Sequence, residues 1–124
     1  MSIQRIFFSL GAICALISVA TGAFAAHALK QKLSADMLTI FEIGARYQMY
    51  HALGLIAVAW ALTQWEHQLL TVAGWMFTFG ILIFCGSLYV LSLTGIRWLG
   101  AITPIGGLAF MVGWFCLAWT AMRS

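Results

Sequence analysis

The sequence predicts an all-α membrane protein, a compact bundle of four transmembrane helices with an interfacial helix between spans one and two. Four long apolar stretches fill most of the 124 residues. A hydrocarbon core about 30 Å thick needs roughly 20 apolar residues of helix to cross it. Inside that core a backbone segment of this length satisfies its own hydrogen bonds as a helix. We therefore expect a single domain, residues 1–124, with spans at about 6–26, 47–62, 69–93 and 99–121.

The composition excludes several functional classes. Hydrophobic residues make up 64% of the chain and charged residues 7%, whereas soluble domains carry about a quarter charged residues. The net charge of +3 comes from six basic residues, too few for a nucleic-acid footprint, so we expect no nucleic-acid partner. A chain that spends its length crossing the bilayer leaves no room for a soluble catalytic domain. Its surroundings are membrane lipid, and any chemistry must take place in or against the membrane.

The first span has features that resemble a signal peptide or a reactive site. Arg5, an apolar run and the small residues around Ala25 imitate a secretory signal, but the run exceeds the usual length of about 7–15 residues, so we expect a mature helix. Cys14, Cys85 and Cys116 all lie inside apolar stretches without metal-ligand spacing, which is typical of cysteines that pack between helices. The sequence therefore predicts no metal and no cofactor.

The break between the first and second stretches predicts the interfacial helix. Ser34 can cap it, and apolar residues recur at helical spacing through Phe41 and Ala45. We expect this helix to continue into the second span. Glu42 and Arg46 lie on its polar side as an i, i+4 pair with the acid on the favoured side.

The other two breaks are short and predict antiparallel neighbours. Residues 63–68 form a tight turn, and Gly95 suits the end of the third helix. Thr103 and Pro104 offer a cap and a first-turn proline for the fourth helix. Either that helix begins as late as Pro104 and residues 96–102 lie along the interface, or Pro104 kinks it inside the membrane.

Small residues recur along three of the spans and predict close helix packing. In lipid, burial gives no hydrophobic drive between helices, so faces that let backbones approach gain dispersion contacts instead. The residues in question are Ser18, Gly22 and Ala26 on span one, Gly80 and Gly86 on span three, and Gly106, Ala109 and Gly113 on span four.

Most polar residues of the spans are expected on one membrane face. Successive spans cross in opposite directions, so the end of span one, the start of span two, the end of span three and the start of span four share that face. If the protein binds a partner, we expect binding there. The candidate binding residues are His27, Glu42, Arg46, Tyr47, Gln48, His51, Tyr89 and Thr103.

Two of these groups allow alternative interpretations. His51 lies a turn inside span two, where an ionisable side chain is costly without a partner. With His27 at matching depth it could ligate a metal or a haem, but a hydrogen-bonded histidine that packs helices together is the commoner role. Glu42 and Arg46 could bind an anionic headgroup or a partner, although an exposed pair is usually a solvated face.

No constellation of residues supports catalysis. The chain has no serine with a histidine base in a plausible turn, no paired carboxylates deep in the bundle and no glycine-rich phosphate loop. We therefore expect no catalytic residues and no enzymatic activity.

Four blocks of the sequence resemble a known family. They are Gly-Ala-Phe-Ala-Ala-His-Ala-Leu at 22–29, Glu-Ile-Gly-Ala-Arg-Tyr-Gln-Met-Tyr-His-Ala-Leu at 42–53, Phe-Cys-Gly-Ser-Leu-Tyr at 84–89 and Thr-Pro-Ile-Gly-Gly at 103–107. In this order they resemble the signature blocks of the small inner-membrane proteins called domain of unknown function 423. The resemblance covers essentially the full length. It implies a bacterial four-span plasma-membrane protein with mitochondrial relatives, and it supplies no catalytic residues.

Three hypotheses for function follow. The leading one is an accessory or structural membrane protein that binds a partner protein or lipid, or forms a homo-oligomer, through the polar face. The second is an oligomeric transporter or channel for a small solute, and the third is a haem or metal carrier using His27 and His51. Basic residues at the polar face outnumber those at the other face by four to two, which favours the polar face as cytoplasmic.

Overall fold

The computed structural model describes residues 1–124 as an all-helical chain without strands. Helix α1 spans Ile3–His27 and α2 spans Ala35–Gln64. The third long run consists of α3 (Gln68–Gly80), a π-helical segment (Ile81–Cys85) and α4 (Gly86–Thr94), and the fourth is α5 (Thr103–Arg123). Short 3-10 segments at Leu29–Gln31 and Arg97–Ala101 lie in the two longer links.

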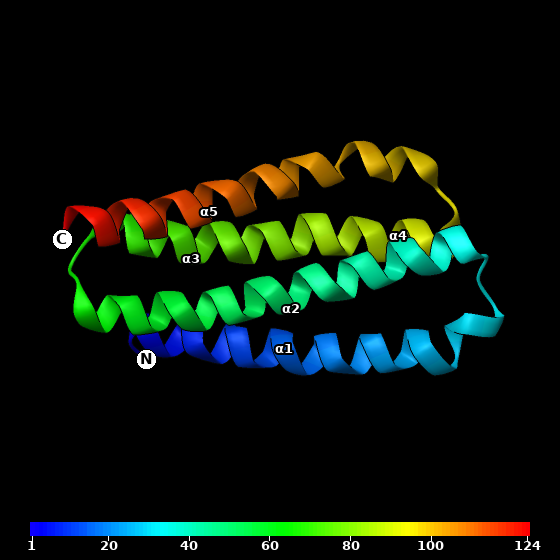
Figure 1. Ribbon diagram of the computed structural model, residues 1–124, viewed down its shortest axis with the longest axis horizontal. Coiled ribbons are helices and arrows are strands. Elements are labelled where there is room, and N and C mark those ends of the chain that lie inside the picture. The colour runs from blue at the N-terminus through cyan, green and yellow to red at the C-terminus, as the bar shows by residue number, and fades with distance from the viewer.

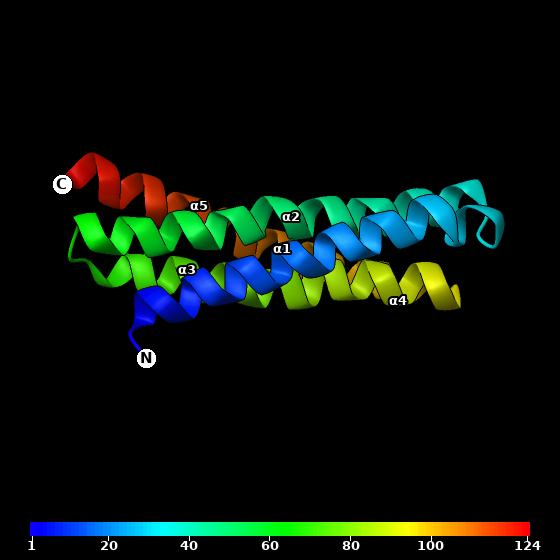
Figure 2. The same ribbon diagram turned by 90° about the horizontal axis from the view of Figure 1, so that it is seen from below.

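The long helical runs lie side by side and alternate in direction (Figure 1). Both termini and the turn between α2 and α3 lie at one end of the bundle, which we call the terminal end. The α1–α2 and α4–α5 links lie at the other end, the link end (Figure 1). Figure 2 shows α1 in front of α2 and the α3–α4 run, with α5 behind them. The central pair is therefore covered by α1 on one side and by α5 on the other.

Three segments are long and apolar enough to cross a membrane. They are Ile3–His27, Gln68–Thr94 and Arg97–Arg123. The expectation of a helical membrane protein is thereby confirmed. Helix α2 is less apolar, because Asp36, Glu42 and Arg46 lie in its first half together with the polar Gln48 and His51.

The core lies where α1, α2, α3 and α5 meet. Phe7, Leu55 and Phe77 are fully buried there, and Phe110 is nearly so. Cys85 and Cys116 belong to the same cluster, and Cys14 packs against it; all three are free thiols. A smaller cluster of Ala25, Leu29 and Phe41 closes the link end.

The expected close approaches occur on α5 and α3. A methyl group at Gly106 would collide with the backbone of Phe84, one at Gly113 with the Phe77 ring, and one at Gly80 with the Phe110 ring. These glycines let α5 lie against the third run at backbone distance, which in lipid replaces hydrophobic association.

Two of the glycines expected in close packing face open space. A Cβ atom at Gly22 or Gly86 would meet nothing within 4 Å. Two other glycines carry close contacts that the sequence did not point to, because Gly74 receives the Phe7 ring and Gly11 faces the Ala52 carbonyl. The choice depends on which side of each helix faces a neighbour, and the spacing of small residues does not fix that side.

The predicted helix ends are largely present. The Ser34 hydroxyl accepts a hydrogen bond from the Met37 N–H at 3.2 Å, and Gly95 ends α4 with a left-handed φ of 75°. Pro104 lies in the first turn of α5, so it begins the helix and does not kink it. Thr103 does not cap α5. Its side chain reaches across to another helix, as described below.

Residues 35–46 form no separate helix. They are the first three turns of the continuous helix α2 and pack inside the bundle, where the Phe41 ring lies 4.9 Å from the Tyr89 ring. The expected continuation into the following apolar stretch is present. The π-helical segment Ile81–Cys85 was not expected from the sequence; such segments insert one extra residue into a helical turn and are frequent at functional sites.

Candidate functional site

Gln48 joins three helices through hydrogen bonds inside the bundle. The Tyr89 hydroxyl on α4 donates to Gln48 Oε1 at 2.7 Å, and Gln48 Nε2 donates to the Cys14 carbonyl on α1 at 2.9 Å. Thr21 Oγ1 lies 3.4 Å from the Tyr89 hydroxyl, and Ser18 Oγ donates to the Ala45 carbonyl at 2.6 Å. Gln48 is only 4% exposed. Two candidate binding residues, Gln48 and Tyr89, therefore act as internal links between helices.

His51 is buried between α2 and α5 with both ring nitrogens occupied. Trp114 Nε1 donates to His51 Nε2 at 3.0 Å, and His51 Nδ1 lies 2.7 Å from the Tyr47 carbonyl. Indole nitrogen only donates and a carbonyl only accepts, so this pattern assigns the neutral tautomer with the proton on Nδ1. The imidazole also stacks on Phe110, with ring centroids 3.5 Å apart and an interplanar angle of 7°. The arrangement matches the helix-packing interpretation of His51.

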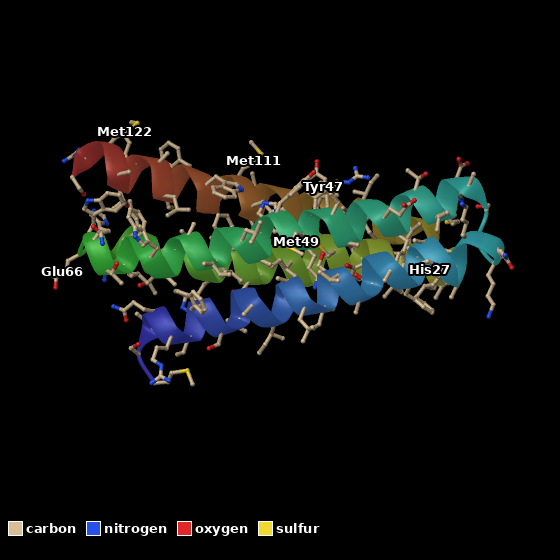
Figure 3. All side chains as sticks on the ribbon, turned by 60° about the horizontal axis from the view of Figure 1, so that its bottom comes forward. His27, Tyr47, Met49, Glu66, Met111 and Met122 are labelled. Carbon is tan, nitrogen blue, oxygen red and sulfur yellow. The ribbon has the colours of Figure 1, made fainter.

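His27 and His51 do not lie at matching depth, and that expectation is wrong. Gln48 is level with Cys14, so His51 lies a further turn toward the terminal end. About 20 Å of helical rise separates Cys14 from His27 along α1. Figure 3 shows His27 near the link end and Tyr47 near the middle of the bundle. The cause is the early start of α2 at Ala35, which moves residues 46–51 away from the end of the helix.

Thr103 joins α5 to the third run. Its Oγ1 lies 2.6 Å from Ser87 Oγ, and Ser87 Oγ also donates to the Phe84 carbonyl at 2.9 Å. This hydroxyl pair sits close to the site where Gly106 meets the Phe84 backbone. Thr103 therefore has an internal partner, like Gln48, His51 and Tyr89.

Glu42 and Arg46 are exposed on the outer side of α2, beside α1. They border a hollow of about 230 Å³ whose other walls are small or flexible side chains. Because Gly22 has no side chain and no neighbour within 4 Å, the hollow is open above α1. Its lining residues are Ser18, Gly22, Glu42, Ala45, Arg46 and Met49. No salt bridge joins Glu42 to Arg46, so the expected ion pair is not formed.

The depth of this hollow was not expected. Ser18 is hydrogen-bonded to the Ala45 carbonyl, so Arg46 lies about 13 Å of helical rise below the link end of α1. An ionisable side chain at such a depth in a membrane-crossing bundle is a functional-site candidate by default.

Tyr47 lies on a different side of α2, beside an aromatic hollow of about 430 Å³. The Tyr47 ring stacks on Phe84 at 4.9 Å between centroids, and it is 36% exposed. The hollow is lined by Tyr47, Tyr50, His51, Phe84, Gly107, Phe110, Met111 and Trp114. The sequence did not point to Phe84, Phe110 or Trp114, because these apolar positions carry no signal that separates a neighbour of His51 from any other core residue.

Comparison with known proteins identifies the family. Residues 21–107 match the family model described as "Protein of unknown function (DUF423)". The chain belongs to this family. The resemblance seen in the four sequence blocks is thereby confirmed.

Relatives in this family are membrane proteins. The UPF0382 membrane protein SSP2132 of Staphylococcus saprophyticus is 50% identical over 114 residues, which cover 92% of this chain and 94% of that protein. The UPF0382 membrane protein YwdK of Bacillus subtilis is 45% identical over 121 residues, 97% of this chain and 98% of that protein. No solved structure matches the chain. The family membership, with the three apolar segments, establishes a helical membrane protein of the DUF423 family.

Proposed function

We propose that the chain crosses the bacterial plasma membrane four times, with α2 as the second span. Helix α2 lies between two apolar helical runs and contacts both along its length. Ala45 and Gln48 bond to α1, while Phe41 and Gly54 pack against Tyr89 and Phe77 of the third run. A helix enclosed in this way crosses the membrane with its neighbours. Its polar side chains Gln48 and His51 are turned inward, as hydrocarbon demands.

In this arrangement only the first turn of α2, around Asp36, reaches the membrane interface. The link end then carries Lys30, Lys32 and Arg97, and the terminal end carries Arg5 and Arg123. Arg46 no longer counts toward either end because of its depth. The remaining basic residues favour the link end as cytoplasmic, with both termini on the outer side.

We propose that the protein is an accessory membrane protein that binds a transmembrane helix of a partner, either another protein or a second copy of itself. The observation that carries this proposal is the exposed Glu42–Arg46 pair beside the open hollow at Gly22. A carboxylate and a guanidinium facing lipid are costly unless something covers them. A partner helix can supply groups of both signs and a side chain that fills the hollow, so the proposed role is binding and not catalysis.

The depth of the pair favours a helix over a lipid headgroup. Arg46 lies about 13 Å below the link end, whereas phosphates lie at the membrane surface. Glu42 would also repel an anionic headgroup held by Arg46. Small residues such as Ser18, Gly22 and Ala45 are the type that transmembrane helices use for close approach.

Photocrosslinking in native membranes tests the proposal. A photoreactive residue replaces Gly22, where the structure leaves room for a larger side chain. We expect a discrete protein adduct, identified by mass spectrometry, and we expect Arg46→Ala to reduce its yield several-fold. The matched control is the same photoreactive residue at Gly86, which also faces open space but on a different helix. It should give only diffuse lipid adducts.

Three outcomes would contradict this function. Equal adduct patterns from positions 22 and 86 would mean that the hollow has no dedicated partner. A lipid adduct at position 22 that depends on Arg46 would replace the helix by a headgroup. Solute flux in vesicles that contain the purified protein, lost in an Arg46→Ala variant, would favour the oligomeric transporter instead.

A further inference from the structure

A second hollow lies at the terminal end of the α1–α2 seam. Its volume is about 580 Å³, larger than the hollow at Glu42 and within the range of small-molecule sites. One wall comes from the start of α1 and the other from the end of α2. The lining residues are Gln4, Arg5, Phe8, Ser9, Ile56, Ala59, Trp60 and Thr63.

The polar part of this groove faces the bundle end. Side chains of an α-helix lean toward its N-terminus, so Arg5 leans toward the membrane surface. Arg5 is exposed, and its guanidinium makes no hydrogen bond within the chain; its backbone N–H donates to the Ser2 capping hydroxyl at 3.3 Å. Trp60 packs edge-on against Trp65 with 5.8 Å between ring centroids. Tryptophans at this position are typical of the membrane–water interface, which puts Arg5 at headgroup level.

The part of the groove farther from the bundle end is apolar. Phe8 and Ile56 line it, and the buried Ala59 leaves room beside them. In a bilayer such a space is filled by a hydrocarbon chain, because water has no polar partners there. The groove therefore combines one free positive charge at the surface with an apolar channel that runs inward from it.

From this combination we infer that the groove binds one anionic phospholipid, with its phosphate on Arg5 and one acyl chain along Phe8 and Ile56. Guanidinium binds phosphate oxygens with two parallel hydrogen bonds. Every membrane lipid can offer an acyl chain, so the chain fixes the position and the charge fixes the selectivity. A basic residue near a membrane surface favours anionic lipid by about fivefold. This site is independent of the proposed partner surface, which lies toward the other end of the bundle.

Native mass spectrometry of the purified full-length protein tests this inference. The protein is released from mixed micelles that contain phosphatidylglycerol or phosphatidylcholine. We expect one retained phosphatidylglycerol per chain, with binding about fivefold tighter than that of phosphatidylcholine. Arg5→Ala should remove this preference, and Arg5→Lys should keep most of it. Ser9→Phe, which fills the groove but keeps the charge, should weaken retention of both lipids.

Arg123→Ala is the matched control. Arg123 is a basic residue at the same end of the bundle, but its guanidinium lies over the Trp119 ring at 5.4 Å and does not line the groove. Its replacement should leave lipid selectivity unchanged. An equal loss of selectivity in the Arg5 and Arg123 variants would reduce the effect to overall charge and overturn the site. Equal retention of the two lipids by the wild-type protein would do the same, whatever the crosslinking at position 22 gives.

Discussion

The Tyr89 hydroxyl donates a 2.7 Å hydrogen bond to Gln48 Oε1 and so ties the third helical run to α2. Gln48 passes the connection on to the Cys14 carbonyl of α1 through its amide nitrogen at 2.9 Å. Three helices that touch lipid on their outer sides are thus joined by one amide side chain. In a bundle without a hydrophobic drive between helices, such bonds contribute to association directly.

Removing the Tyr89 hydroxyl should weaken the bundle modestly. Tyr89→Phe keeps the ring against Phe41 but leaves Gln48 Oε1 without its donor. We expect a loss of about 1 kcal/mol in the free energy of unfolding in detergent, within the range for interhelical hydrogen bonds in membranes. A double-mutant cycle with Gln48→Leu isolates the pair. A coupling energy of zero between the two sites would contradict the assigned bond.

His51 should contribute more than its hydrogen bonds alone. His51→Ala removes the acceptor of Trp114 and the ring stacked on Phe110, and it leaves a cavity. We expect it to lower the free energy of unfolding by about 2 kcal/mol or more. Trp114→Phe keeps an aromatic ring and loses only the N–H donor, so its cost should be about 1 kcal/mol. If Trp114→Phe proved the more harmful change, the stacking would not be the larger contribution.

The two glycines nearest the π-helical segment should respond oppositely to alanine. At Gly106 a methyl group would overlap the Phe84 backbone, and backbone atoms cannot turn aside, so Gly106→Ala should cost about 1–3 kcal/mol. Gly86→Ala adds a methyl group in open space and should leave stability unchanged or raise it slightly. Thermal unfolding of the two variants in one detergent makes the comparison. Similar losses in both would mean that the close approach is absent in solution.

The four-span arrangement predicts a specific labelling pattern. In a cysteine-free background, single cysteines at Ser2 and Ser124 should react with a membrane-impermeant thiol reagent from the same side of the membrane. A cysteine at Lys30 should react only from the opposite side. Both termini lie at the terminal end and Lys30 at the link end (Figure 1), so this pattern requires α2 to cross the membrane. Labelling of the two termini from opposite sides would contradict it.

Local features of the sequence anticipated where the helices begin and end. Ser34 caps α2, Gly95 ends α4 with a positive φ, and Pro104 starts α5. Each of these depends on a residue and its near neighbours in the chain, which is why single positions suffice to predict them. The length of the apolar stretches likewise predicted the helical membrane fold.

The depth of the polar residues could not be predicted in the same way. The chain of inference placed residues 46–51 at one end of the second span because the apolar run begins there. The structure extends α2 back to Ala35, since Phe41 and Ala45 pack against α4 and α1. Helical periodicity describes a face and leaves open how far one helix is shifted along another.

The sequence by itself determined the class of this protein, its family and the order of its helices, because apolar length, caps and turns act locally along the chain. Only the tertiary structure decided which polar side chains serve the interior and which face outward. His51 meets Trp114, and Ser87 meets Thr103, through the relative rotation and shift of whole helices. Those are set by close contacts such as Gly106 against Phe84, and the same contacts leave Glu42, Arg46 and Arg5 on the outer surface.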